Sequence, residues 1–138
     1  MIRVTRCYRF PAAHVLFNPA FSDQENRDVF GKCANPNGHG HNYGVEVSVA
    51  GEVDPETGQV VPVEALDALF DERVRRPMSH RMLNELDAFH GLVPTAEVIA
   101  RVVHERLSPA IAERHGARLA RVRIVETPRN TAEYGDRT

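Results

Sequence analysis

The alternation of apolar and polar residues predicts two β-strands in the first half of the chain. In residues 2–10 the apolar positions are Ile2, Val4, Tyr8 and Phe10, and in residues 43–53 Val45, Val47 and Val49 alternate with polar neighbours. A period of two residues is typical of a strand with one face in the core. Residues 54–58 predict a turn, and we expect residues 59–61 to extend the hairpin briefly.

Two helices are predicted next. Their apolar stripes are Val63, Leu66, Phe70 and Val74 in the first, and Ile99, Val102, Val103 and Leu107 in the second. Pro62 suits the first turn of a helix, and Pro77 is expected to end that helix. Thr95 is the expected N-cap of the second helix. We expect Ser108-Pro109 to interrupt this helix and Gly116 to end it.

Two more strands are expected at residues 119–126 and 131–134, although Val122 falls out of phase with its apolar neighbours. The element order β-β-α-α-β-β predicts an α+β fold with an antiparallel sheet, formed by one domain over residues 1–138. Residues 15–40 are rich in Asn, Gly, Pro and Asp and are expected to form a long functional loop. Two helices cover only one face of such a sheet and leave two edge strands, so we expect a homo-oligomer.

Composition excludes several classes of protein. The chain has 138 residues, of which 42% are hydrophobic and 26% charged, with a formal net charge of −2. A nucleic-acid-binding protein would normally present a basic face, and the apolar runs are too short to span a membrane. We therefore expect a cytoplasmic protein with no nucleic-acid or membrane partner. Cys7 and Cys33 are expected to be free thiols, with Cys7 a small buried residue.

Histidines in the first third of the chain have the spacing of a metal site. His39 and His41 are two residues apart next to a strand, so their side chains are expected on one side, and His14 ends another strand-like run. Three imidazoles leave one position of a tetrahedral Zn²⁺ ion open, which is typical of a catalytic site. Cys33 lies between them, either as a proton-transfer thiol or as a fourth ligand that would close the site.

Several motifs resemble the 6-pyruvoyl-tetrahydropterin synthase family, which includes the 6-carboxy-tetrahydropterin synthases. They are Phe10–His14, Phe30–Tyr43, Gly51–Gly58, His80–Asn84, Pro94–Glu97 and Glu126–Thr127, followed by Asn130 and Tyr134. The resemblance thus runs along nearly the whole chain. The stretch 35–38 before the paired histidines is more similar to the pyruvoyl enzymes than to the shorter loop of the carboxy enzymes.

The resemblance implies a fold, a substrate and roles for individual residues. The fold is the tunnelling fold, in which three subunits close a barrel and two trimers stack into a hexamer. The substrate is 7,8-dihydroneopterin triphosphate, from which the pyruvoyl enzymes eliminate triphosphate. The implied Zn²⁺ ligands are His14, His39 and His41; the implied catalytic residues are Cys33 and His80; and the implied substrate-binding residues are Glu126 as pterin anchor, with Thr127 and Thr95.

One position departs from the family pattern. The residue before His80 is usually Asp in the family, and here it is Ser79, which orients an imidazole by hydrogen bonding but does not stabilise an imidazolium by charge. We include Ser79 among the catalytic positions, with Asp71, Glu85 or Asp87 as possible replacements for the carboxylate. Two alternatives therefore remain. One is a 6-carboxy-tetrahydropterin synthase or another dihydroneopterin side-chain reaction, and the other is a non-catalytic oligomer that binds pterin and zinc.

Overall fold

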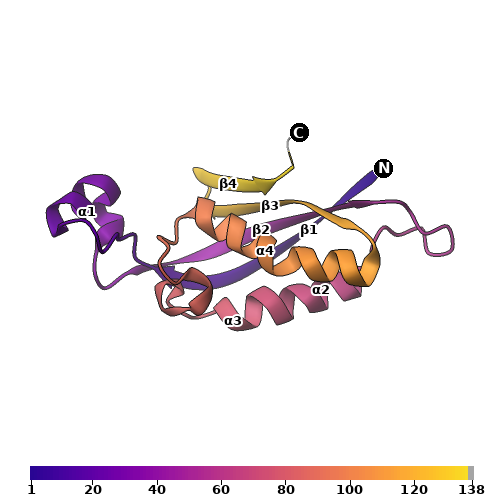
Figure 1. The fold of residues 1–138 in the computed structure, drawn as a ribbon, viewed down its shortest axis with the longest axis horizontal. Helices are drawn as coiled ribbons and strands as arrows, with labels where there is room; N and C mark the ends of the chain where they lie inside the picture. The colour runs from indigo at the N-terminus through magenta and orange to yellow at the C-terminus, as the bar shows by residue number, and fades with distance from the viewer. Residues whose placement is uncertain (137–138) are drawn as a thin grey trace.

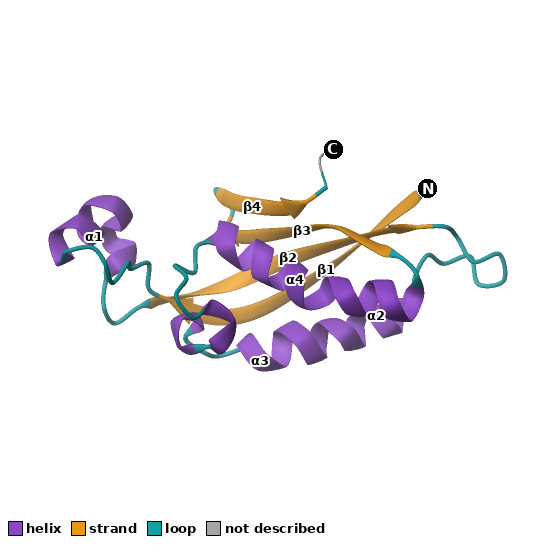
Figure 2. Ribbon diagram, in the orientation of Figure 1, coloured by secondary structure: helices purple, strands orange, loops and turns teal. Residues whose placement is uncertain are grey.

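The computed structural model describes residues 1–136 and has an antiparallel sheet in the order β1-β2-β3-β4. The strands are β1 (Ile2–His14), β2 (His39–Gly51), β3 (Arg118–Thr127) and β4 (Asn130–Gly135). Helix α2 (Val63–Phe70) continues through a π-helical segment (Asp71–Arg75) into α3 (Arg76–Met78), and α4 (Ala96–His115) packs beside it. Both lie on one face of the sheet (Figures 1 and 2). The predicted α+β class with an antiparallel sheet is confirmed.

The core lies between this face of the sheet and the helices. Even-numbered residues of β1, such as Phe10, and odd-numbered residues of β2, such as Tyr43 and Val47, point into it and are buried. The predicted alternation is interrupted in β3. Ser48 pairs with Arg121 and Val49 with Leu119, so Ala120 is an extra residue in the ladder. This irregularity allows both Leu119 and Val122 to face the core, which explains why Val122 looked out of phase.

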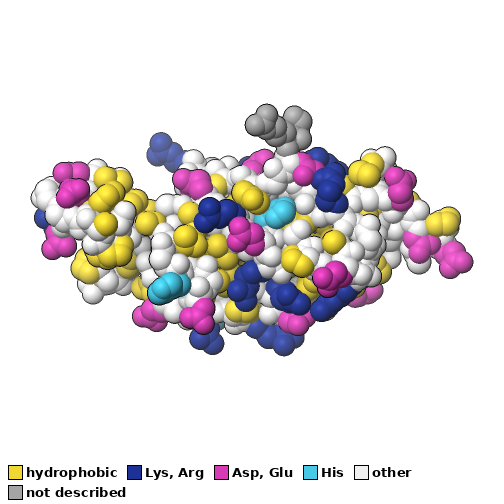
Figure 3. All heavy atoms as spheres, in the orientation of Figure 1, with side chains coloured by type: hydrophobic (Ala, Val, Ile, Leu, Met, Phe, Trp, Pro, Cys, Tyr) yellow, Lys and Arg dark blue, Asp and Glu magenta, His cyan; other side chains and the backbone are white. Residues whose placement is uncertain are grey.

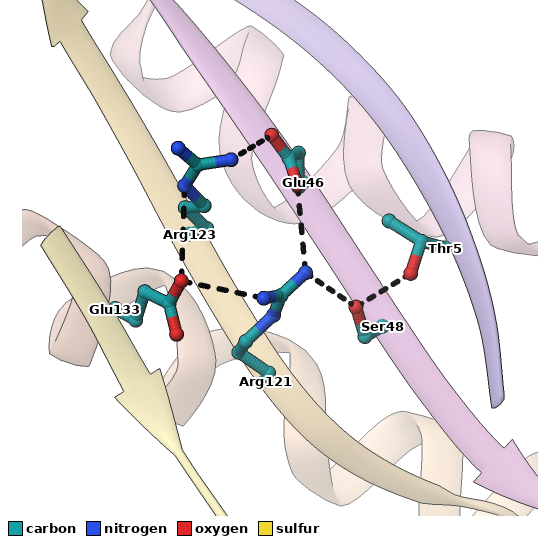
Figure 4. A network of polar contacts seen from close by, with 6 residues as sticks. All are labelled: Thr5, Glu46, Ser48, Arg121, Arg123 and Glu133. Atoms are coloured by element: carbon teal, nitrogen blue, oxygen red, sulfur yellow. Dashed lines mark hydrogen bonds and ion pairs between the residues drawn. The ribbon is translucent and has the colours of Figure 1, made fainter. Parts of the chain in front are cut away.

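The other face of the sheet carries polar and charged side chains (Figure 4). Arg121 contacts Glu46, Ser48 and Glu133, and Arg123 extends the network to the same two carboxylates. Cys7 points to this side and is exposed, so the expectation that it is buried was wrong. Cys7 and the buried Tyr8 are consecutive residues of β1, so their side chains point to opposite faces of the sheet. Both cysteines are free, as expected.

The stretch between β1 and β2 contains a helix that the sequence pattern did not predict. Helix α1 (Asp23–Phe30) begins at Ser22, whose side chain accepts a hydrogen bond from the Glu25 backbone while the Glu25 side chain accepts one from the Ser22 backbone. This capping box satisfies two otherwise unpaired donors. The 3₁₀ turn η1 (Gly31–Ala34) follows, and Figure 1 shows α1 projecting beyond the end of the sheet.

Two proline expectations were only partly met. Helix α4 runs through Pro109 without interruption, because Pro109 lies on the exposed side of the helix where solvent compensates for the lost hydrogen bond. Pro77 lies in the last turn before the helix ends at Met78. Because Pro77 has no N–H, it does not donate a helical hydrogen bond to the Arg73 carbonyl. This carbonyl instead accepts a hydrogen bond from Arg106 Nε at 2.9 Å. Residues 59–61 form no strand, and Val60 and Val61 are bends, so the predicted extension of the hairpin was wrong.

The connection between α3 and α4 contains short helical turns. Two 3₁₀ turns, η3 (Leu83–Glu85) and η4 (Asp87–Phe89), link α3 to α4. On the helical face of the molecule, acidic and basic side chains are interspersed (Figure 3), in agreement with the small net charge. Within residues 1–136 no helix is long and apolar enough to cross a lipid bilayer.

A cluster at the β1–α2 contact gives a prediction about stability. Asp67 accepts hydrogen bonds from Arg6 at 2.9 and 3.0 Å and from Tyr8 at 2.8 Å. The hydrogen bond from Arg6 is the main cause that lowers the pKa of Asp67 below its ordinary value of 3.8. A lowered carboxyl pKa contributes stability above that value, and the contribution is lost as the pH falls through the folded pKa.

We therefore expect Asp67→Asn to lower the melting midpoint near pH 7 by about 2 °C, a small effect because the pair is exposed. The difference from wild type should shrink as the pH falls below the ordinary carboxyl pKa of 3.8 and disappear once the pH is below the lowered pKa of Asp67 in the folded protein. Melting curves over a pH series measure it, with the exposed loop variant Glu56→Gln as control. A difference that persists at low pH would contradict the ionic origin of the effect.

Candidate active site

The pairing of β1 with β2 brings the three predicted histidines together. In the strand register His14 lies opposite His39, and Ala12 lies opposite His41. All three imidazoles point to the same face of the sheet as the buried Tyr43, at the end of the core. The triad therefore continues the apolar stripe of the two strands, and the rigid ladder fixes where each ring begins.

The ring nitrogens of the triad are close enough to share one ion. The ligand atoms of His14, His39 and His41 all lie within 4.8 Å of one another. His14 Nε2 is 2.9 Å from His39 Nε2. Among the described residues, this close group consists of the three histidines and does not include Cys33, so the geometry favours an open three-ligand site over a closed four-ligand site.

His14 is held by its second ring nitrogen. The Pro94 carbonyl lies 2.8 Å from His14 Nδ1, and the Tyr43 hydroxyl lies 3.1 Å from the same atom. Because a carbonyl only accepts hydrogen bonds, Nδ1 carries the proton and donates a hydrogen bond to the Pro94 carbonyl. Nε2 is then unprotonated, and its lone pair faces the other histidines. Contacts of this kind orient the ligands of metal sites.

Burial favours the cation-binding form of two of the three histidines, His14 and His39. It is the main cause that lowers the pKa of both His14 and His39; the Pro94 carbonyl opposes the shift at His14, and the nearby His41 adds to the shift at His39. A lowered imidazole pKa favours the neutral ring at neutral pH, and a metal ion binds the neutral ring.

The donor set fits a divalent metal ion. His41 Nε2 is buried and has no hydrogen-bond partner within the described part of the chain. A buried unpaired nitrogen is costly unless something binds it. An ion held by the Nε2 atoms of His14, His39 and His41 removes this cost at His41 and uses the lone pair that the Pro94 contact leaves free on His14.

Cys33 lies in the 3₁₀ turn η1, between α1 and β2. Its carbonyl accepts a hydrogen bond from the Leu16 backbone at 2.9 Å, which ties the turn to the end of β1. Burial raises the pKa of Tyr43, and the charges of Glu126 and of the Cys33 thiolate raise it further. The hydrogen bond from Leu16, two residues after His14 in the chain, holds the Cys33 backbone near the end of β1, and the role of Cys33 in proton transfer stays a prediction.

Two of the three expected substrate-binding residues lie at the end of β3. Glu126 is half-buried and extends toward the triad, with Oε2 3.9 Å from His14 Nε2. The Thr127 side chain accepts from the Arg129 backbone at 3.2 Å. Thr95, in contrast, is the N-cap of α4 and accepts from Val98 at 3.2 Å. Thr95 follows the carbonyl that holds His14, so it also lies at this end of the sheet.

His80 and Ser79 lie across the edge of β1 from the triad. The His80 backbone donates to Pro11 at 2.7 Å, and the Ala13 backbone donates to Arg81 at 2.9 Å, which fixes this segment along the edge of β1. His80 has φ of 59°, an unusual conformation for a residue with a side chain and one that occurs at functional sites. His80 and His41 line the same open hollow of about 460 Å³.

The side chain of Ser79 has no partner that could take the place of the family carboxylate within the described residues. The Ser79 hydroxyl is buried and has no hydrogen-bond partner among residues 1–136. Asp71, a possible replacement for the carboxylate, pairs with Arg75 instead. Glu85 lines a hollow of about 740 Å³ together with Gly31 and Lys32 of η1. The structure therefore places Ser79 beside His80 and assigns no carboxylate to it.

Two contributors to the site had no predicted role in it. Tyr43 and Pro94 both contact His14 Nδ1. Tyr43 had a detectable signal, because it lies two residues after His41 and therefore on the same face of the strand. Pro94 contributes a backbone carbonyl, and no side-chain pattern in the sequence identifies it.

We expect each single variant His14→Ala, His39→Ala and His41→Ala to lose most of the bound metal, from about one ion per chain in wild type, because two imidazoles hold an ion weakly. Metal analysis after desalting measures the loss. His90→Ala, which removes an exposed histidine, is the control and should keep its metal. Full metal retention in the triad variants would contradict the site.

Known proteins with the same architecture give the family. The sequence profile described as "6-pyruvoyl tetrahydropterin synthase" matches residues 3–137. The 6-pyruvoyl tetrahydrobiopterin synthase of Homo sapiens is 38% identical over 133 residues, which are 96% of this chain and 90% of that protein. The probable 6-carboxy-5,6,7,8-tetrahydropterin synthase of Halobacterium salinarum is 33% identical over 118 residues, which are 74% of this chain and 72% of that protein.

The fold agrees with these sequence relationships. The solved structure of 6-pyruvoyl tetrahydropterin synthase from Caenorhabditis elegans superposes with a TM-score of 0.87 at 35% identity, and the match covers 99% of this chain and 96% of that one. The Plasmodium falciparum enzyme shares the fold at 16% identity, with a TM-score of 0.61 over 96% of each chain. The subunit architecture of the tunnelling fold expected from the motifs is thus confirmed, and this chain belongs to the 6-pyruvoyl tetrahydropterin synthase family.

Proposed function

We propose that this chain is a zinc-dependent lyase that converts 7,8-dihydroneopterin triphosphate to 6-pyruvoyl-tetrahydropterin with loss of triphosphate. The observation that carries the proposal is the convergence of His14, His39 and His41 next to Glu126, in a chain of this family. Relatives at 35–38% identity bear the name of this synthase over nearly the whole chain.

Zinc is the ion that suits the proposed ligands. Three neutral imidazoles that leave one tetrahedral position open are typical of catalytic Zn²⁺. Such an ion, when bound, acts as a Lewis acid toward oxygen atoms of the substrate and makes the neighbouring C–H bonds more acidic. The protein's own part is to keep His14 oriented through Pro94 and to favour neutral rings at His14 and His39 through burial.

Glu126 is the proposed anchor of the pterin ring. Its carboxylate offers two acceptor oxygens, which match the adjacent N–H and amino donors on the edge of a 2-amino-4-oxo pteridine. Thr127 and Thr95 supply further contacts: each hydroxyl already accepts a backbone hydrogen bond and still has its O–H to donate. Anchoring at Glu126 directs the side chain of the substrate toward the histidine triad.

Proton transfer is assigned to Cys33 and His80. The Cys33 thiolate removes a proton from a carbon of the substrate side chain, and the electron pair left on that carbon expels triphosphate from the neighbouring carbon. His80 delivers a proton on the opposite side of the substrate, so hydrogen is redistributed within the product. Ser79 replaces the carboxylate that would stabilise protonated His80 by charge.

We further propose that residues 1–138 form one domain and that the active protein is a homo-oligomer, a hexamer by resemblance to the family. The family match over residues 3–137 supports a single domain. The sheet supports assembly, because β1 and β4 are both edge strands and expose backbone groups that another copy can pair with. The segment that carries His80 covers only the end of the β1 edge, at Pro11–Ala13.

The proposed reaction is tested by product analysis after incubation of the zinc-loaded protein with 7,8-dihydroneopterin triphosphate. We expect the pyruvoyl product together with free triphosphate, and at least a 100-fold lower rate for Cys33→Ala, since general-base catalysis contributes on the order of 10²–10⁴. Cys7→Ala, which removes a thiol from the far face of the sheet, is the matched control. A carboxy product with acetaldehyde, or binding without turnover, would contradict the proposal.

A second prediction concerns Ser79. Because the Ser79 hydroxyl is buried and unpaired beside His80, Ser79→Asp places a charge where the imidazolium forms. We expect this variant to raise kcat by about tenfold or more, since orienting carboxylates in triads contribute up to roughly 10⁴. Ser79→Asn has the same shape without the charge and should leave kcat near that of wild type. Equal rates for the two variants would show that charge at this position does not limit turnover.

A further inference from the structure

Glu126 occupies an irregular position in the β3–β4 hairpin. Val125 pairs with Thr131 and Thr127 pairs with Asn130, so Glu126 is an extra residue between two paired positions. Bulges of this kind redirect a side chain and occur next to active sites. Here the bulge lies where the Glu126 side chain extends toward His14.

The two oxygens of this carboxylate have different partners. Oε2 faces the triad, 3.9 Å from His14 Nε2. Oε1 accepts a hydrogen bond from Asn130 Nδ2 at 3.2 Å, across the turn of the hairpin. Glu126 is thus held from one side by a neutral amide, while its other oxygen stays directed toward the site.

We propose that Asn130 is a positioning residue that sets the orientation of Glu126 for pterin recognition. The inference rests on the proposed function of Glu126 as the pterin anchor and adds a residue that does not touch the substrate. A free glutamate side chain loses rotational entropy when it is fixed. The hydrogen bond from Asn130 restricts the Glu126 side chain before the ligand binds, so less rotational entropy is lost on binding.

The chemistry of the contact is compatible with ligand binding. A carboxylate has about four lone-pair positions, and the Asn130 amide uses one of them. The others remain for the two adjacent donors of the pterin edge. An amide is also the side chain best suited to this place: it donates to the carboxylate without a charge that would neutralise it. Asn130 itself is exposed, so its side chain is accessible to substitution with little effect on packing.

The test compares two variants that remove the donor in different ways. Asn130→Ala deletes the amide, and Asn130→Asp keeps its shape but places a second negative charge against Glu126. We expect the dissociation constant for 7,8-dihydroneopterin, a pterin without the leaving group, to rise about tenfold in the first variant and further in the second. Fluorescence titration of the zinc-loaded protein measures both, and in turnover KM should rise more than kcat falls.

A second readout separates positioning from a structural role. Glu126 recognises the amino group of the ring, so wild type should prefer a 2-amino-4-oxo pteridine over its 2,4-dioxo analogue, and Asn130→Ala should weaken this preference. Thr131→Ala, next to Asn130 in β4, is the control and should behave like wild type. Metal content and melting curves confirm that the variants are folded and loaded.

The outcomes distinguish this inference from the proposed function. If both Asn130 variants bind 7,8-dihydroneopterin as tightly as wild type does, Asn130 does not position Glu126. The same conclusion follows if they lose affinity for the 2-amino-4-oxo and the 2,4-dioxo pteridine in the same proportion. In both cases only this inference is overturned. If zinc-loaded wild type binds no pterin, the proposed function fails and this inference fails with it.

Discussion

The antiparallel register between β1 and β2 is the constraint on which the candidate site depends. It places His14 opposite His39 and turns His41 to the same face, so three imidazoles from two segments meet without help from a flexible loop. A shift of one residue would move every side chain of a strand to the other face. The buried stripe that continues from Phe10 and Tyr43 into the core makes such a shift costly, and hydrophobic packing thereby fixes the metal geometry.

The same burial gives the site its chemical character. It favours neutral rings at His14 and His39, and it leaves the unpartnered Nε2 of His41 to be satisfied by an ion. The Pro94 carbonyl then fixes the tautomer of His14. The proposed proton-transfer residues lie on connecting segments: Cys33 follows the projecting helix α1, and His80, with its positive φ, lies at the edge of the sheet. A rigid metal centre with acid and base groups on loops is a common division of roles in enzymes.

Sequence periodicity was sufficient for most of each strand, for the main helices and for placing His39 and His41 on one face, because these depend on a spacing of two or about four residues that the sequence displays directly. That His14 joins them depends on the pairing of β1 with β2. Helix α1 was missed although its Ser22–Glu25 capping box is a local signal, since its side chains lack a clear apolar stripe. The bulge at Ala120 and the contact between Asn130 and Glu126 depend on how two strands pair, which one strand alone does not encode. The resemblance to a known family supplied the substrate and the roles of Glu126 and His80.

The central claim is that His14, His39 and His41 together hold one catalytic ion. X-ray absorption spectroscopy at the zinc edge, on protein loaded with one equivalent of Zn²⁺, tests it most directly. The account predicts three imidazole nitrogens at about 2.0–2.1 Å and a light-atom fourth ligand from solvent or substrate. A sulfur ligand at about 2.3 Å would assign Cys33 to the metal and contradict an open catalytic site, and a shell with fewer than three imidazoles would contradict the triad itself.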